Sequence, residues 1–215
     1  MPAVLRALQG GIESMYRVET DLDVCDFLVG GDERDAFQPE RTPREQLLIR
    51  REEDGLSLGL FVDERTLENL AMRDPRRRLD AANLQDFLYA VEGVSHFVYL
   101  VHRARQERPV SAVELELQAE VDKYLVALLV TWNQAGEPPA DLRERLFANI
   151  RFAGDLSREE RERYELANSA ASGYAASLEE RFVRNHAVDD MLGEVRQFYR
   201  KGLAQKLEYI SQLAA

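Results

Sequence analysis

Hydrophobic positions recur with helical spacing over most of the chain, and the clearest pattern lies between residues 83 and 133. From about Asn83 to Glu107, apolar residues cover one broad face of a projected helix and much of the opposite face, which is typical of a buried helix. A second helix is predicted from Ser111 to about residue 133, because Ser111 and Glu114 have the spacing of a capping box. Pro109 ends the first helix, so two long helices joined by a short turn form the predicted centre of the fold.

The N-terminal third shows a different pattern, which predicts a small antiparallel sheet. Residues 45–62 alternate between apolar and polar positions around Asp54-Gly55, a dipeptide that favours a hairpin turn. A further strand is predicted within 24–29, and the polar stretch 30–43 is predicted to be a loop because it has no periodicity. Helices are predicted for residues 2–16 and for residues 64–72, the latter capped by Asp63.

The C-terminal part is predicted to be helical throughout. The sequence Gly136-Glu137-Pro138-Pro139 marks a break, and a short helix is predicted for 140–150. Ser157 and Glu160 form a second capping box, which begins a long helix ending near Arg184. One last helix is predicted from about Val188 to Leu213. The helix after Ser157 carries small residues that would let another helix approach closely: Ala170, Ala171, Gly173, Ala175 and Ala176.

These elements predict a mainly α fold of the α+β class. We expect a helical bundle of about four long helices, with a small antiparallel sheet or hairpin from the N-terminal third packed against it. The length of 215 residues fits a single domain spanning 1–215, with a mixed α/β part at 1–72 and a bundle part at 83–213.

Charge and composition narrow the expected partners. The chain carries 39 acidic and 28 basic residues, so its formal net charge is −11. This excess disfavours nonspecific binding to nucleic acid or to anionic membranes, both of which require a basic surface. The single Cys25 precludes an internal disulfide, and neither a signal segment nor a run of about 18 apolar residues is present. We therefore expect a cytoplasmic protein that does not associate with membranes.

Two polar stripes on the central helices form the main candidate site. Glu92 and His96 are four residues apart, as are Glu116 and Glu120, so each pair shares a helix face. If the stripes face each other, their oxygen and nitrogen atoms could bind a divalent metal ion. The competing interpretation is an ion-pair network in which Arg103 and Lys123 neutralise the glutamates.

Other polar groups have a structural interpretation that we prefer. Arg76, Arg77 and Arg78 could contact an anion such as a nucleotide, together with the Gly30-Gly31 loop, but a run of arginines in a connector is usually a solvated turn. His186, with Asp189 and Asp190, is typical of a helix start. Ser95 and His102 lack an elbow motif for nucleophilic catalysis, so we expect the Ser95 hydroxyl to bond back to its own helix.

No motif of a functionally defined family is present, and we predict no cofactor. The expected function is that of a structural or regulatory module acting through a protein partner or through self-association. The alternative is a metal-dependent helical-bundle enzyme that uses Glu92, His96, Glu116 and Glu120.

Overall fold

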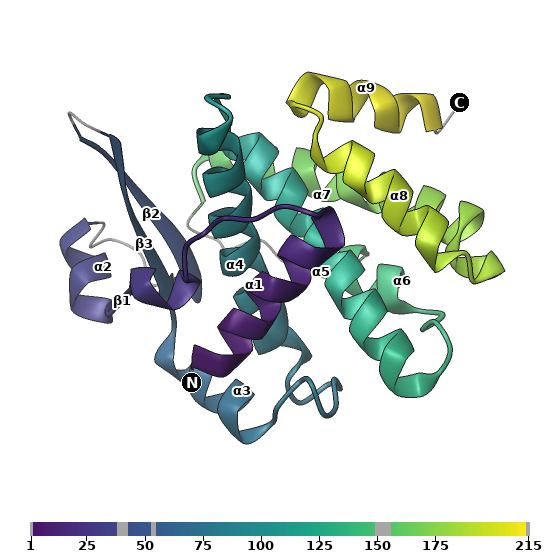
Figure 1. Cartoon of the computed structure of the whole chain (residues 1–215), viewed down its shortest axis with the longest axis horizontal. Helices are drawn as coiled ribbons and strands as arrows, with labels where there is room; N and C mark the ends of the chain where they lie inside the picture. Colours follow the sequence, from purple (N-terminus) through teal and green to yellow (C-terminus); the bar gives the residue numbers. More distant parts are fainter. Residues whose placement is uncertain (1, 38–42, 53–54, 149–155, 214–215) are drawn as a thin grey trace.

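The computed structural model of the protein describes residues 2–37, 43–52, 55–148 and 156–213. Helices make up most of it, and a small sheet lies against one side of the helical bundle (Figure 1). The predicted α+β class is therefore confirmed. In the described residues, no helix combines the length and the apolar character that crossing a bilayer requires.

The N-terminal third supplies the first helices and all the strands of the described residues. The predicted helices at 2–16 and 64–72 are present, and Asp63 accepts a hydrogen bond from the Arg65 amide as the expected cap. The elements are α1 (Pro2–Tyr16), η1 (Val24–Phe27), β1 (Leu28–Val29), α2 (Gly31–Phe37), β2 (Glu45–Glu52), β3 (Gly55–Val62) and α3 (Glu64–Met72).

Strands β2 and β3 form the predicted antiparallel hairpin. Leu47 pairs with Leu60, and Glu52 pairs with Gly55 beside the turn, where residues 53 and 54 lie outside the described part. The short strand β1 adds to the other edge of β3 in parallel, giving the strand order β1-β3-β2. The sheet is therefore mixed and not purely antiparallel as expected, and the strand expected within 24–29 is limited to Leu28–Val29, after the 3-10 helix η1. Leu60 is fully buried under α4, whereas the end of the hairpin near its turn extends away from the helices (Figure 1).

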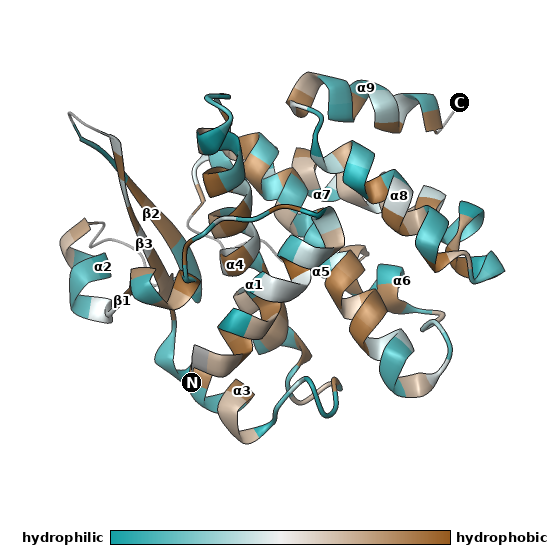
Figure 2. Cartoon of the chain, viewed as in Figure 1, coloured by the Kyte–Doolittle hydropathy of each residue, from teal (hydrophilic) through white to brown (hydrophobic). Residues whose placement is uncertain are grey.

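The central pair forms as predicted, as α4 (Leu84–Arg105) and α5 (Ala112–Ala135). Ser111 accepts a hydrogen bond from the Glu114 amide, which is one half of the expected capping box. The Glu114 side chain instead accepts hydrogen bonds from Tyr99 of α4 and from the Leu203 amide. Figure 2 shows hydrophobic positions along both central helices, in keeping with their place in the core.

The remaining elements surround this pair. The predicted helix at 140–150 is shorter in the structure, and its last expected residues, 149 and 150, lie outside the described part. Ser157 and Glu160 make both hydrogen bonds of the expected capping box. The elements are α6 (Leu142–Phe147), α7 (Arg158–Arg181), η2 (Val183–Asn185), α8 (Val188–Tyr199) and α9 (Leu203–Leu213).

Two predicted segments differ from the structure. The stretch 30–43 was expected to be a loop, but residues 31–37 form α2, which is held by a tertiary contact: the Arg34 guanidinium lies 4.5 Å from the centre of the Phe61 ring. The single helix expected over 188–213 is two helices, α8 and α9. The break spans residues 200–202, and the first amide of α9, that of Leu203, donates to Glu114 of α5 at 3.2 Å. Both differences depend on contacts with distant segments, which local periodicity does not report.

Candidate metal centre between the central helices

Helices α4 and α5 are antiparallel, and this brings their two polar stripes together. Glu92, in the first half of α4, contacts Lys123 at the middle of α5, whereas Arg103, late in α4, contacts Glu114 near the start of α5. His96 lies between these points and faces Glu116. The predicted meeting of the two stripes therefore occurs in the structure.

Lys123 provides the expected neutralisation for two of the glutamates. Its Nζ donates hydrogen bonds to Glu92 at 3.0 Å and to Glu120 at 2.7 Å. Burial opposes the charged form of this lysine, but the adjacent carboxylates of Glu120 and Glu92 outweigh that effect and raise the pKa of Lys123. Burial likewise raises the pKa of Glu120, although the charge of Lys123 acts in the opposite direction. One largely buried cation, Lys123, thus holds both Glu92 and Glu120.

His96 and Glu116 are less completely satisfied. His96 Nε2 lies 3.6 Å from Glu116, a distance beyond an ordinary hydrogen bond, and this nitrogen has no hydrogen-bond partner among the described residues. The two residues are only 7% and 8% exposed. A buried polar atom without a partner costs roughly 1–3 kcal/mol, so this pair would gain from a ligand placed between them.

Glu92, His96 and Glu116 together have the geometry of a metal-binding group. One donor atom from each lies within 4.8 Å of the donor atoms of the other two. An imidazole with two carboxylates is a donor set that suits zinc, manganese or iron. Glu120, the fourth residue of the two stripes, is not part of this group.

Two residues that the sequence analysis did not single out complete the cluster. Glu45, the first residue of β2, places Oε2 3.9 Å from His96 Nδ1, and Arg163 of α7 places Nε 3.8 Å from Glu116. Glu45 shares a strand face with Leu47, which was a signal available in the sequence, because a carboxylate on an apolar face needs a partner. Arg163 gave no such signal, since arginines are frequent on the exposed face of a helix.

The electrostatics of the cluster reflect its burial. Burial and the repulsion from Glu92 raise the pKa of Glu45 to about 8. Burial alone would lower the pKa of His96, but the adjacent Glu116 and the charges of Glu45 and Glu92 raise it to about 9. The pKa of Glu116 is lowered, because the effects of His96 and Arg163 exceed that of burial. Without a metal ion, protons on His96 and Glu45 balance the charge of this cluster at neutral pH.

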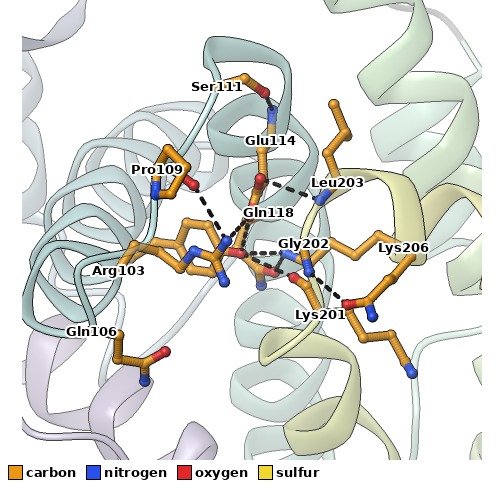
Figure 3. A network of polar contacts seen from close by, with 12 residues as sticks. Arg103, Gln106, Pro109, Ser111, Glu114, Gln118, Lys201, Gly202, Leu203 and Lys206 are labelled. Atoms are coloured by element: carbon orange, nitrogen blue, oxygen red, sulfur yellow. Dashed lines mark hydrogen bonds and ion pairs between the residues drawn. The ribbon is translucent and has the colours of Figure 1, made fainter.

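Arg103, expected to neutralise the same glutamates, belongs to a different network. Its Nη2 lies 3.4 Å from Glu114 and donates to the Pro109 carbonyl at 3.3 Å (Figure 3). Glu114 also accepts from Tyr99 at 2.7 Å. This second polar network lies at the other end of the α4–α5 interface, near the start of α9 (Figure 3).

The second network continues through the core to residues that local sequence patterns did not indicate. Lys206 of α9 donates to Gln118 at 2.7 Å and to the Tyr99 hydroxyl at 2.9 Å. Gln118 in turn donates to Asp122 at 2.8 Å, and Asp122 accepts from Ser95 at 2.5 Å. The expectation that Ser95 bonds back to its own helix is thus wrong, because a carboxylate of the neighbouring helix lies within reach. Each of the groups from Lys206 to Ser95 has a protein partner.

Several of the remaining candidates make contacts within the protein. Arg76 hydrogen-bonds to Asp74, and Arg78 lies 3.0 Å from Asp80, as expected of a solvated turn. Asp189 and Asp190 lie in the first turn of α8. His102 contacts Gln106 at 3.0 Å.

Several small residues of α7 pack against other parts of the protein. Ala171 is fully buried, and Ala175 is almost so. A Cβ at Gly173 would lie 3.7 Å from Ile210 of α9. Part of this face therefore packs against other helices of the same chain, whereas Gly173 itself stays exposed.

Comparisons with models of protein families, with curated proteins and with solved structures each found no match to this chain.

Proposed function

We propose that this protein binds a divalent transition-metal ion between α4 and α5 through Glu92, His96 and Glu116. The observation that carries the proposal is the convergence of their three donor atoms within 4.8 Å. The unpartnered, buried Nε2 of His96 supports it, because a ring nitrogen in this position can bind a metal ion. Glu45 faces the other ring nitrogen, as carboxylates commonly do behind a histidine that binds a metal.

The charge of the cluster also supports a divalent ion. The cluster holds four carboxylates, those of Glu45, Glu92, Glu116 and Glu120, and two permanent cations, Lys123 and Arg163. When His96 is neutral, as metal binding requires, and Glu45 has also released its proton, two negative charges remain without a counter-charge. A divalent cation supplies the two positive charges that balance them, whereas a monovalent cation supplies only one.

Burial of the ligands favours a structural role for the ion. A catalytic metal must keep one coordination position open to water or substrate. Here His96 and Glu116 are enclosed between helices, and α7 covers them through Arg163. We therefore propose that the ion fixes α4 and α5 against each other and against the hairpin that carries Glu45. The alternative of a metal-dependent enzyme requires in addition a movement that opens this site.

Titration of chelator-treated protein with Zn²⁺ and Mn²⁺ tests the proposal by calorimetry and thermal unfolding. We expect saturation at one ion per chain, and an increase in unfolding free energy of about 2.7 kcal/mol at a free metal concentration one hundred times Kd. Glu116→Gln should weaken binding at least tenfold, because it removes one ligand charge. Glu208→Gln, on the exposed side of α9, should leave it unchanged.

The proposal fails if neither metal binds to the wild-type protein. It also fails if Glu116→Gln and Glu208→Gln bind the metal as tightly as the wild type. In either case the cluster is an ion-pair network only.

A second candidate function, self-association, is favoured by the exposed apolar face of the hairpin. Ile49 is 37% exposed and Leu56 is 45% exposed, and they continue the strand face on which Leu60 is buried. Strand β2 lies at the edge of the sheet, and exposed apolar edge strands are templates for pairing with another chain. We propose that a second copy of the protein covers this part of the hairpin.

Sedimentation velocity over a range of concentrations tests self-association. We expect a dimer in the wild-type protein and a monomer in Ile49→Lys, because a buried lysine opposes the contact. Met72→Lys is the matched control, since Met72 is 78% exposed but lies on α3, outside the hairpin. A wild-type protein that stays monomeric throughout, or a dimer that Ile49→Lys does not weaken, would exclude this role for the hairpin.

A further inference from the structure

A small apolar pocket opens between α1, α4 and α5, away from the metal cluster. Its volume is about 140 Å³, and its lining is almost entirely apolar, with Phe87 of α4 and Val126 and Val130 of α5 opposite α1. Apolar cavities of about 150 Å³ hold one benzene molecule. The pocket therefore matches a single aromatic ring in both size and polarity.

Gly11 keeps this pocket open. It lies in the interior of α1, where glycine costs about 1 kcal/mol relative to alanine. A Cβ at Gly11 would meet no atom within 4 Å, so close packing does not require glycine at this position. Gly11 lines the pocket, and a larger side chain there would extend into space that the pocket now occupies.

Arg76 is the one charged residue among the described residues that line the pocket. Its Nε and Nη2 donate to the Asp74 carboxylate at 2.9 Å and 2.7 Å, so its charge is already balanced. A carboxylate on a ligand would compete with Asp74 for the guanidinium, whereas a neutral oxygen could accept one of the remaining N–H groups of Arg76. The lining thus favours a neutral ligand over an anionic one.

We propose that this pocket binds a neutral single-ring aromatic molecule that carries one oxygen acceptor, of the phenol or benzyl alcohol class. The ring lies against Phe87, Val126 and Val130, and the oxygen faces Arg76. This site is independent of the metal cluster, which lies on other residues of the same helices.

Ligand-observed NMR with phenol, benzyl alcohol and benzoate tests this proposal, with the full-length protein at millimolar ligand concentrations. We expect saturable binding of the two neutral ligands and at least tenfold weaker binding of benzoate. Gly11→Leu should reduce binding of the neutral ligands at least tenfold by filling the pocket.

Gly10→Leu is the matched control. Gly10 precedes Gly11 in the same helix, a Cβ there also meets nothing within 4 Å, and Gly10 does not line the pocket. Gly10→Leu should bind the two neutral ligands as tightly as the wild type does. Circular dichroism should show that Gly10→Leu and Gly11→Leu are both folded. To separate pocket filling from damage to α1, Gly11→Ala should remain folded and bind more tightly than Gly11→Leu. Absence of binding to wild type, equal binding by Gly11→Leu and Gly10→Leu, or tighter binding of benzoate than of benzyl alcohol would each overturn the proposal.

Discussion

Lys206 is a basic side chain enclosed entirely by protein, and its exposed fraction is 0%. Its Nζ donates to Gln118 and to Tyr99, but no carboxylate lies in direct contact with it among the described residues. Burial therefore lowers its pKa to about 7, although the more distant charges of Glu114 and Asp122 favour the protonated form. The folded protein holds this proton less tightly than the unfolded chain does.

This shift predicts a specific dependence of stability on pH. Between pH 7 and 10, the unfolded state keeps the Lys206 proton and the folded state releases it, so the contribution of this residue to stability rises with pH. Relative to Lys206→Met, the wild-type protein should gain about 2 kcal/mol of unfolding free energy between pH 7 and 9. Urea unfolding of both proteins at the two pH values measures the difference. A difference that stays constant with pH would show that Lys206 keeps its ordinary pKa in the fold.

Some of the buried polar residues could be identified from the sequence. Glu92, His96 and Glu116 could be found because helical spacing places them on two stripes within one helix pair. Lys206 could not, because a lysine among Leu203, Leu207 and Ile210 is equally compatible with a side chain that reaches out to solvent. Its burial depends on Gln118, which lies 88 residues away in sequence.

At the scale of elements, Gly93 lets side chains of the hairpin pack closely against α4. A Cβ at this position would lie 2.9 Å from Leu60 Cδ1 and 3.1 Å from Glu45 Oε2. Glycine thus lets the sheet approach α4 closely enough to place Glu45 beside His96. Because Gly93 has no side chain, Glu45 of β2 has room beside His96 of α4.

Gly93→Ala should therefore destabilise the protein. Overpacking costs typically 1–3 kcal/mol, and the better helix propensity of alanine returns about 1 kcal/mol, so we expect a net loss of about 1 kcal/mol in urea unfolding. Gly193→Ala is the matched control, because Gly193 also lies in a helix but a Cβ there meets no atom within 4 Å. The control should be neutral or slightly stabilising. If both variants behaved alike, close packing at Gly93 would not be the reason for its glycine.

Element boundaries were predictable where a local signal sets them. Asp63, Ser111 and Ser157 each cap a helix at the expected residue, because a capping bond joins residues two or three positions apart. The start of α9 was not predictable, since its Leu203 amide is satisfied by Glu114 of α5. Sequence periodicity continues through this break because α8 and α9 both present an apolar face to the bundle.

At the scale of the whole molecule, two polar clusters lie along one helix interface. The cluster of Glu92, His96 and Glu116 joins α4 and α5 to β2 and α7, whereas the second polar network, which contains Lys206, joins the same two helices to α1 and α9. The fold class followed from the sequence because it requires only the number and type of elements. Which elements cover which end of the central pair did not follow, because Glu45, Arg163 and Lys206 come from segments that no local pattern connects.

The second polar network, which contains Lys206, also has a consequence for folding during synthesis. Gln118 contacts Tyr16 on one side and Lys206 on the other, so one buried side chain joins segments from the first and the last helices described. During synthesis the earlier segments leave the ribosome first and begin to fold. Until Lys206 has emerged, the carbonyl oxygen of the Gln118 side chain lacks the partner it has in the folded protein. A nascent chain released before that point would carry a defect in its interior, and quality control could distinguish it from the finished protein.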